Sequence, residues 1–365
     1  MSAGRERLSI LITGACGVAP RAIARSLVLS ERFRDARLVG ADRGGNWYGF
    51  YEGLYERVYR VLEPRDPGYA DLIGEICRRE SIDVAIVGPE AEILYWSEHE
   101  FPTPALLPSP RFVRIAISKR NLYDALQDTG LIPRYSVVGR DDLLARRGLE
   151  LDGEAIWLRD YAEASSSGSG SIKVADLEQA YAWAYLNPAI ANYMAAEHLP
   201  GRNVACCLLF YEDELLKAGC YERLEYFMGR LAVSGITGNI SRGCVTDDPE
   251  AREVSERAIR TIASESDEPA HGLFTVDLRA AGDGSLKITE INVRHVANTS
   301  AVAAGGANLA EAQVLATLGR RDEIGDVVVP VGEGNAILRD IDGPPLWIAD
   351  YHDPAIGDYV DRAST

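Results

Sequence analysis

Acidic residues in the last third of the chain are spaced for chemistry. Residues 274–295, FTVDLRAAGDGSLKITEINVRH, have the pattern of two β-strands around Asp283-Gly284, a dipeptide preferred in two-residue hairpin turns. With that turn as the loop, Asp277 lies directly opposite Glu290. Directly opposed like charges destabilise a hairpin, so this pair suggests a role beyond strand pairing.

Two further polar side chains extend this arrangement. Because side chains alternate along a strand, Asn292 and Arg294 fall on the same face as Glu290. Carboxylate and amide oxygens suit Mg²⁺, which usually takes one or two carboxylates together with water and nucleotide phosphates. The pattern predicts a metal site made by Asp277, Glu290 and Asn292. The alternative is a solvent-exposed hairpin face.

A basic strand followed by a Ser/Gly loop is the second signal. Arg159 lies in the predicted strand 155–161, and Lys173 follows the loop ASSSGSGS at residues 164–171. Such a loop can fold over phosphates and exclude water, as a lid does. The alternative is a surface linker.

Two arginines in residues 221–243 are candidates for holding a substrate anion. Arg223 and Arg242 lie beside small residues, and arginine binds carboxylate or phosphate through two parallel hydrogen bonds. Either arginine could equally be a surface charge.

Strand and helix patterns alternate through residues 8–116. Short apolar runs at 8–14, 36–42 and 83–89 predict strands, and the residues between them have helical spacing. Strands that alternate with helices form parallel sheets with right-handed crossovers. This part of the chain is therefore predicted to be an open α/β domain.

A Pro-rich segment, residues 101–110, closes that unit. Ser118 is predicted to cap a helix that ends at Gly130. Residues 194–203, MAAEHLPGRN, are interpreted as a helix end that turns through Pro-Gly into a strand.

From about residue 131 the pattern changes to strands and hairpins with two inserted helices, which predicts an α+β domain. One helix is expected over residues 176–187. The other is expected over residues 246–266, with Asp247 or Asp248 near its cap and Pro249 in its first turn.

The composition is that of a globular chain. The 365 residues include 38 Lys and Arg against 55 Asp and Glu, a formal net charge of −17, with 47% hydrophobic and 25% charged residues. These fractions exclude disordered, collagen-like and coiled-coil classes. The negative charge argues against nucleic acid as a partner, so an anionic ligand would need a local basic site, often with a metal.

Cysteine use and hydropathy bear on the compartment. The six cysteines form no CxxC pair, so we expect reduced thiols and a cytoplasmic protein. No run of 18 or more apolar residues occurs, so no membrane span is expected.

A glycine turn after the first strand raises a rival interpretation. Residues 13–20, TGACGVAP, could cradle phosphate, and Asp42 at the end of the second strand could bind a ribose. However, Pro20 stands where the dinucleotide fingerprint has its third glycine, and no tyrosine has lysine four residues on. A strand-to-helix turn is favoured, and an NAD(P)-dependent oxidoreductase remains the alternative.

In this order the motifs resemble the ATP-grasp superfamily, and within it single-copy relatives of the synthetase half of the carbamoyl phosphate synthetase large subunit. The resemblance covers about residues 8–325. Its most specific part is the hairpin in which Asp277 precedes Glu-x-Asn-x-Arg at residues 290–294. Residues 118–133, the Ser/Gly loop and EHLPGRN at residues 197–203 support it.

The resemblance implies contacts for ATP. Lys119 and Arg159 would contact the phosphates, and Glu197 with the backbone near His198 and Leu199 would hold the adenine. The lid over the phosphates would comprise Ser165, Ser166, Ser167, Gly168, Ser169 and Gly170.

The sequence departs from the family pattern at three of these positions. Ser118 stands where an aspartate usually precedes the lysine, and Arg159 stands where lysine is commoner. Asn203 falls where an acidic residue usually binds the ribose, so it weakens the nucleotide assignment more than the charge-preserving Arg159 does.

Roles at the reacting end of ATP also follow from the resemblance. Asp277, Glu290 and Asn292 would bind Mg²⁺ or Mn²⁺, and Arg294 would steady the transferred phosphoryl group. The resemblance does not assign the pocket of the acceptor substrate, for which Glu92, Arg223, Arg242 and His295 are candidates.

The resemblance implies a pre-ATP-grasp Rossmann-like domain followed by a two-lobed ATP-grasp domain. We expect the first at residues 1–115 and the second at 116–328, with a lid lobe at about 131–195 and a metal and nucleotide lobe at about 196–328. Residues 329–365 would form a C-terminal extension.

The implied activity is an ATP- and Mg-dependent carboxylate–amine ligase that works through an acyl phosphate and releases ADP and phosphate. Its partners would be a small-molecule carboxylate and amine, with a homodimer left open. The rivals are an ATP-binding protein without ligase activity and the NAD(P)-dependent oxidoreductase.

Overall fold

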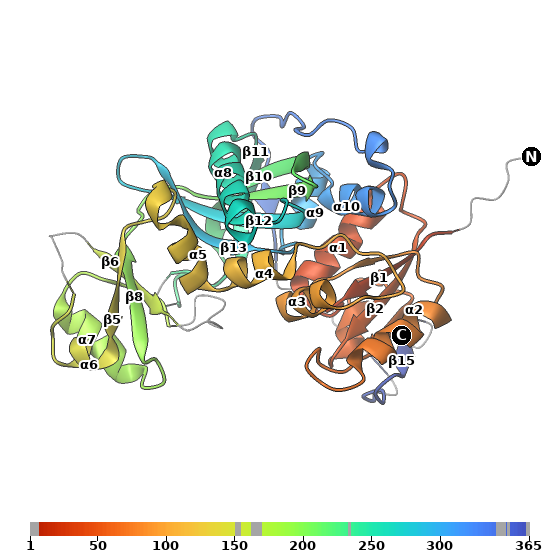
Figure 1. The fold of residues 1–365 in the computed structure, drawn as a ribbon, viewed down its shortest axis with the longest axis horizontal. Helices are drawn as coiled ribbons and strands as arrows, with labels where there is room; N and C mark the ends of the chain where they lie inside the picture. Colours follow the sequence, from red (N-terminus) through yellow and green to blue (C-terminus); the bar gives the residue numbers. More distant parts are fainter. Residues whose placement is uncertain are drawn as a thin grey trace, which may run out of the picture.

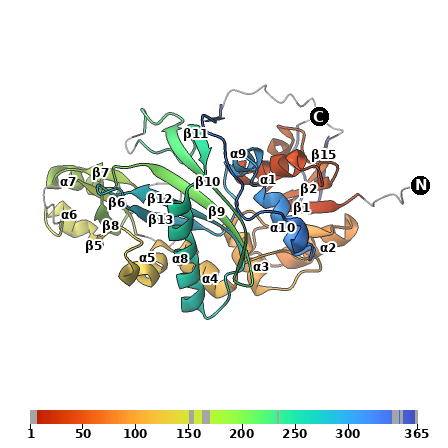
Figure 2. The same cartoon turned by 90° about the horizontal axis from the view of Figure 1, so that it is seen from above.

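Three β-sheets in a row form the framework of the chain. The computed structural model describes residues 7–149, 155–161, 170–232, 235–340, 348 and 351–362. A five-stranded sheet lies at one end, a six-stranded sheet in the middle and a four-stranded sheet at the other end (Figures 1 and 2). The expected combination of α/β and α+β folding is therefore confirmed.

The five-stranded sheet has the order β15-β3-β2-β1-β4, and its four N-terminal strands are parallel. The three strands predicted in this region are confirmed, and β3 and β15 are additional. The strands are β1 (Ser9–Thr13), β2 (Arg37–Asp42), β3 (Arg57–Arg60), β4 (Val84–Ile86) and β15 (Tyr359–Asp361). The accompanying helices are α1 (Val18–Leu29), η1 (Asn46–Phe50), α2 (Tyr69–Arg79) and α3 (Glu90–Glu98).

Two helices that follow the N-terminal sheet, α4 and α5, each begin at a serine N-cap. Ser109 begins α4 (Pro110–Ile117) by accepting a hydrogen bond from Phe112 N. Ser118 begins α5 (Lys119–Leu126) by accepting one from Asn121 N, as predicted. A short 3₁₀ helix, η2 (Gln127–Thr129), extends α5 to Gly130.

The four-stranded sheet has the order β5-β8-β6-β7, with β8 between two neighbours. Its strands are β5 (Tyr135–Gly139), β6 (Ile156–Asp160), β7 (Ile172–Val174) and β8 (Asn192–Glu197). The helices α6 (Arg140–Leu144) and α7 (Leu177–Leu186) accompany it.

The interpretation of residues 194–203 as a helix end is wrong, because residues 192–197 form β8. Four consecutive residues of this strand, 193–196, are buried. A short apolar run of this kind does not show strand alternation and cannot be told from a buried helix by its periodicity.

The six-stranded sheet is antiparallel, with the order β13-β12-β9-β10-β11-β14. Its strands are β9 (Asn203–Tyr211), β10 (Glu214–Tyr226), β11 (Ile240–Thr246), β12 (Gly272–Ala280), β13 (Leu286–Asn292) and β14 (Ile337–Leu338). The helices packed on it are α8 (Pro249–Ser266), α9 (Thr299–Ala304) and α10 (Leu309–Thr317).

The two faces of this sheet pack against different parts of the molecule. The face that carries Phe274, Val276 and Leu278 packs in one apolar core with α8, which Figure 2 shows lying along the sheet. Leu273 faces the other way, into the core under α9 and α10. Further along that second face, Asp277 leaves the core and lines a cavity.

Two short strands within the predicted C-terminal extension, residues 329–365, pair with two of the sheets. β14 pairs with β11 at the edge of the middle sheet, and β15 pairs antiparallel with β3 in the N-terminal sheet. A 3₁₀ turn, η3 (Arg321–Glu323), lies between α10 and β14.

All six cysteines are free thiols, as expected. Within the described ranges, no helix has both the length and the apolar content that crossing a bilayer requires.

Candidate functional site

The β12–β13 hairpin differs from the prediction in its turn, but the predicted opposition of Asp277 and Glu290 is present. Hydrogen bonds from Gly284 N to Ala281 O (3.0 Å) and from Ala281 N to Ser285 O (2.8 Å) close a loop of residues 282–284. The two-residue turn was therefore wrong, and it is replaced by a three-residue loop with glycine in the left-handed conformation.

A β-bulge restores the predicted register. Leu278 pairs with Ile288, whereas Asp277 pairs with Glu290, which leaves Thr289 as an extra residue in β13. The opposition of Asp277 and Glu290 is thus confirmed. The longer loop shifts the pairing by one residue, and the bulge shifts it back. Bulges often re-aim groups next to functional sites. Here the bulge presents the Thr289 carbonyl to Arg159, whose Nη1 donates to it at 3.2 Å.

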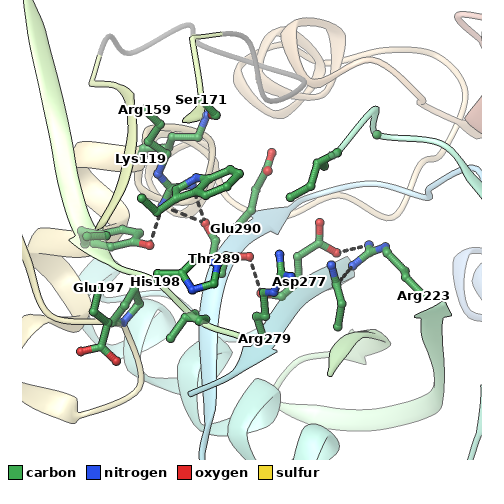
Figure 3. Close-up of a pocket in the computed structure, with 18 of the residues that line it drawn as sticks. Lys119, Arg159, Ser171, Glu197, His198, Arg223, Asp277, Arg279, Thr289 and Glu290 are labelled. Atoms are coloured by element: carbon green, nitrogen blue, oxygen red, sulfur yellow. Dashed lines mark hydrogen bonds and ion pairs between the residues drawn. The ribbon is translucent and has the colours of Figure 1, made fainter. Parts of the chain in front are cut away.

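One cavity of about 200 Å³ gathers most of the predicted residues between the middle sheet and the four-stranded sheet (Figure 3). Its walls come from the middle sheet, the four-stranded sheet and α5. The predicted residues that line it are Lys119, Arg159, Glu197, His198, Leu199, Asn203, Arg223, Asp277 and Glu290. We call this space the central cavity.

Other predicted residues lie elsewhere. Arg242 is in an exposed ion pair with Glu225 (2.7 Å), with half of its side chain accessible, so the structure does not bring it to the central cavity. Arg294 does not line the cavity either. It forms an ion pair with Glu90, with its Nε 3.1 Å from Glu90 Oε1. Asn292 is buried and pairs with Thr275 in the hairpin.

The predicted lid falls mostly outside the described residues, since Ser165, Ser166, Ser167, Gly168 and Ser169 are not among them. Gly170 is described, and its carbonyl accepts a hydrogen bond from Trp183 Nε1 at 2.9 Å.

Burial and like charge perturb the two carboxylates of the hairpin. The pKa of Glu290 is raised, first by burial and then by Asp277, while Lys119 and Arg159 oppose the rise. Burial lowers the pKa of Lys119, against the influence of Glu290. These charges therefore interact with one another at partly buried positions, where electrostatic interactions are stronger than in bulk water.

The donor set at this position fits a hard divalent cation. Asp277 and Glu290 are paired neighbours, and Asn292 follows on the same face. A cation would relieve the repulsion that raises the pKa of Glu290. The described residues contain no cluster of three or more His, Cys, Asp or Glu side chains arranged for a metal, so two carboxylates and an amide are the available set.

Arg223 holds Asp277 in place. Its Nη2 lies 2.6 Å from Asp277 Oδ1, and its Nη1 donates to Asn203 Oδ1 at 2.9 Å. Asn203 Nδ2 in turn donates to the Tyr226 hydroxyl at 2.8 Å. Asn203 therefore lines the cavity, but its amide is engaged on both sides by the chain's own groups.

Arg159 is aimed into the cavity from β6. It is 8% exposed, and its guanidinium donates to the Tyr123 hydroxyl of α5 and to Thr289 O of β13. Its buried Nε has no hydrogen-bond partner within the described part of the chain. The side chain thus ties three elements together and retains one donor.

Glu197 and His198 lie where β8 ends and the chain continues toward β9. Glu197 N donates to Arg134 O (2.9 Å), and the Glu197 carboxylate pairs with Arg134 Nε (2.9 Å). Figure 3 shows this carboxylate turned away from Asp277 and Glu290. The pKa of His198 is lowered by burial and then by Lys173 and Arg279.

Several lining residues were missed at the sequence level. Trp157 and Arg279 both line the central cavity. The signal for them was strand alternation, because each lies two residues from a predicted site residue on the same strand, Arg159 and Asp277 respectively. Glu90, the first residue of α3 and distant in the sequence, also influences the pKa of Glu290, and no local pattern marks it.

The glycine turn after β1 is filled by the chain itself. Asp42 Oδ2 accepts a hydrogen bond from Cys16 N at 2.9 Å, and its Oδ1 accepts one from Gly44 N at 3.2 Å. A Cβ on Gly14, which has a φ of +63°, would lie 2.6 Å from the Pro89 ring. The turn therefore packs against the β4–α3 connection, and the acid proposed for a ribose is used internally.

A buried acid, Glu92, lies beside this turn. It is 6% exposed, and its Oε2 is buried with no hydrogen-bond partner within the described ranges. Burial raises its pKa to about 7 and Asp42 adds to the rise, while hydrogen bonds with Thr13 and Tyr69 oppose it.

Stability should therefore fall as the pH rises through this window. The unfolded carboxyl ionises near 4.5 and the folded one near 7, so the folded state binds the proton more tightly between those values. Glu92→Gln should remove this slope and raise the free energy of unfolding at pH 8 by about 3 kcal/mol. Urea unfolding at pH 5 and pH 8 measures both effects. Glu100→Gln, at an exposed position, is the matched control, and an unchanged slope in Glu92→Gln would contradict the assignment.

Comparison with solved structures shows the class to which this architecture belongs. Phosphoribosylamine–glycine ligase from Thermotoga maritima matches with a TM-score of 0.61 and 15% identity over 90% of this chain and 78% of that chain. The L-amino acid ligase from Bacillus licheniformis matches with a TM-score of 0.59 and 13% identity over 86% and 75% of the two chains.

A third neighbour carries a nucleotide. N5-carboxyaminoimidazole synthetase from Staphylococcus aureus, complexed with ADP, matches with a TM-score of 0.59 and 13% identity over 91% of this chain and 80% of that chain. No protein-family model and no curated protein matches the sequence. The chain thus has the ATP-grasp fold of these ligases.

Proposed function

We propose that this protein is an ATP- and Mg-dependent ligase that joins a carboxylate to an amine. The observation that carries the proposal is the central cavity. There, nine residues marked by the sequence converge from separate elements between the middle sheet and the four-stranded sheet. The ATP-grasp fold of solved ligases supports it. A carboxylate oxygen would attack the γ-phosphorus of ATP, the bond to the β,γ-bridging oxygen would break, and ADP would leave.

The second half of the reaction would use the resulting acyl phosphate. The amine nitrogen would attack the acyl carbon and lose a proton, and inorganic phosphate would leave as the amide forms. Such an intermediate hydrolyses in water, so the enclosed setting of the central cavity suits it.

Positive side chains would hold the nucleotide phosphates. Lys119 enters from the first turn of α5 and Arg159 from β6, so they reach the cavity from two separate elements. The unpartnered Nε of Arg159 is a donor available to a phosphate oxygen. Trp157 and Leu199 line the same space and offer apolar surface to the base.

Asp277, Glu290 and Asn292 would hold the metal ion. When bound, Mg²⁺ would neutralise charge on the phosphates during transfer. Arg223 would position Asp277, to which it is already bound. Arg294 pairs with Glu90, so we assign it to joining the hairpin to the N-terminus of α3 in place of the phosphoryl contact expected from the sequence.

Thermal unfolding with and without nucleotides separates this proposal from the oxidoreductase. Mg-ATP at 100 times its Kd should stabilise the chain by about 2.7 kcal/mol, because ligand bound only to the folded state shifts the equilibrium. NADH at the same concentration should leave the unfolding midpoint unchanged. Stabilisation by NADH alone would overturn the ATP assignment.

Product analysis separates the ligase from an ATP-binding protein without that activity. ADP and phosphate should appear only when both a carboxylate and an amine are present. Nucleotide binding without any such release, across a panel of acids and amines, would leave a binding protein as the correct description.

A further inference from the structure

A second, larger cavity lies beside the central one and contains none of the predicted site residues. Its volume is about 1000 Å³, and its walls come from α1, η1, residues 297–301 and β14 with its flank. The two cavities share the connection between β10 and β11. Tyr226 lines the central cavity, while the next residue, Phe227, lines the second.

Three arginines meet in this second cavity, which we call the arginine groove. Arg21 and Arg25 come from α1, and Arg339 follows β14. The pKa of Arg339 is lowered by burial and then by Arg25 and Arg21, so the three guanidinium groups are close enough to repel one another. Such a concentration of positive charge favours an anion.

The groove has fewer carboxylates than guanidinium groups among its described lining residues. Glu52 serves two of the arginines at once, with Oε1 2.5 Å from Arg25 Nη1 and 3.7 Å from Arg21 Nη1. Asp340 is the other acid among the described lining residues. Three guanidinium groups therefore face two carboxylates.

Buried polar atoms in the groove are left without hydrogen-bond partners in the described structure. They are Arg21 Nε, Arg339 Nη1 and Asn298 Oδ1. Orphaned polar atoms of this kind are rare in folded proteins and call for a partner that is not part of the chain. Two are donors, a number that matches the two oxygens of a carboxylate, and one is an acceptor.

Asn298 is specifically placed for a ligand. It is 5% exposed and stands at the N-cap of α9, yet its side chain makes no capping hydrogen bond. It instead contacts the Tyr221 hydroxyl, whose pKa is raised to about 12, chiefly by burial. Tyr221 accepts a hydrogen bond from Arg223 Nη2 at 3.1 Å, and Arg223 holds Asp277. A continuous polar chain thus joins the groove to the hairpin carboxylates.

Apolar side chains surround the basic end of the groove. Five large apolar side chains that line the groove are each at least 45% exposed to solvent. They are Val28, Leu29, Tyr48, Met228 and Leu338. An occupant with an apolar body would cover this surface.

We propose that the arginine groove binds one of the two substrates, an organic acid with an apolar body and an N–H or O–H donor beside its carboxylate. The carboxylate would lie on Arg21 and Arg339, and the donor would meet Asn298 Oδ1. An α-amino acid with an apolar side chain has this chemistry. That the ligand is a substrate rests on the proposed ligase function, whereas its binding does not.

Calorimetric titration of the full chain, with and without Mg-ADP, tests the binding directly. The probes are L-leucine, L-leucinamide, which lacks the anion, and 4-methylpentanoate, which lacks the donor. L-leucine should bind at least tenfold more tightly than either of the others. Equal affinity for leucinamide, tighter binding of isopentyl phosphate, or no heat from any probe at 10 mM would overturn the proposal.

Variants locate the site. Arg339→Met, at the sheet edge, should weaken leucine binding at least tenfold, and Arg339→Lys should recover part of the loss. Arg257→Met, at an exposed position of α8, is the matched control and should bind like the parent chain. Arg21→Met provides a second site variant in case Arg339→Met folds poorly, as judged by its unfolding midpoint. Undiminished binding in folded Arg339→Met and Arg21→Met would overturn the site.

Failure of this inference and failure of the proposed function give different results. Leucine binding that depends on Arg339 without any ADP release supports the groove and contradicts the ligase. ADP release with other acids, together with no leucine binding, supports the ligase and overturns the groove.

Discussion

Glu290→Gln is expected to lower the rate of ADP formation by about 10³-fold or more, which corresponds to about 4 kcal/mol of lost transition-state stabilisation. The substitution keeps the size of the side chain and removes its charge. Glu290 is a half-buried carboxylate whose charge interacts with those of Asp277, Lys119 and Arg159. Without it, the proposed metal set would keep one carboxylate, and the cation that offsets phosphate charge would bind weakly.

The fold should survive this substitution. Burial and Asp277 both raise the pKa of Glu290, so the ionised side chain is held at a cost in the folded state. The Glu290→Gln unfolding midpoint should therefore equal or exceed that of the parent chain. The rate should be measured over a range of Mg²⁺ concentrations, with Glu253→Gln on the exposed face of α8 as the matched control. Turnover within tenfold of the parent, with the same Mg²⁺ requirement, would sink the metal assignment.

The opposition of Asp277 and Glu290 could be inferred from the sequence. The loop length and the bulge that produce it could not. Strand alternation and turn residues placed Asp277 opposite Glu290, which the structure confirms. The turn is one residue longer than predicted, and the bulge at Thr289 compensates for it. Local propensity favours Asp-Gly in either loop length, so only the packing of the whole sheet selects between them.

Two charged residues far from the hairpin in the sequence, Glu90 near the site and Arg339 in the arginine groove, escaped sequence reasoning for a related reason. Glu90 begins a helix of the N-terminal sheet, and Arg339 follows β14, which was expected to lie in an extension. Each is one charged residue without a local pattern. Their positions follow from how the sheets pack, which residue periodicity does not encode.

Helical and strand elements with clear end signals were predicted best. The helix over residues 249–266 has its Asp248 cap and its Pro249 start, and the Ser118 cap places Lys119 at the start of α5. β8, in contrast, was mistaken for a helix end because four of its consecutive residues are buried. Capping chemistry is local, whereas burial on both faces depends on neighbours that the strand itself does not specify.

Arg159→Met is expected to lower kcat/KM for ATP by about 10³-fold, since we propose that this buried guanidinium binds phosphate, and a buried charge is worth more than an exposed one. Arg159 also ties β6 to α5 and β13, so a loss of activity alone would not separate phosphate binding from a structural role. Two further variants make the separation. Arg159→Lys keeps the charge, and Tyr123→Phe removes only the hydroxyl contact.

If phosphate binding is the main role of Arg159, its charge should matter more than its hydrogen bonds within the chain. Arg159→Lys should then recover kcat/KM to within about tenfold of the parent, and Tyr123→Phe should stay within about threefold, since both leave a cation at the end of β6. If joining the lobes is the main role, both variants should be nearly as impaired as Arg159→Met, and all three should unfold at lower urea concentrations. Nucleotide affinity measured by calorimetry distinguishes these outcomes without turnover, because removing a phosphate-binding cation weakens ATP binding even when the lobes remain in place.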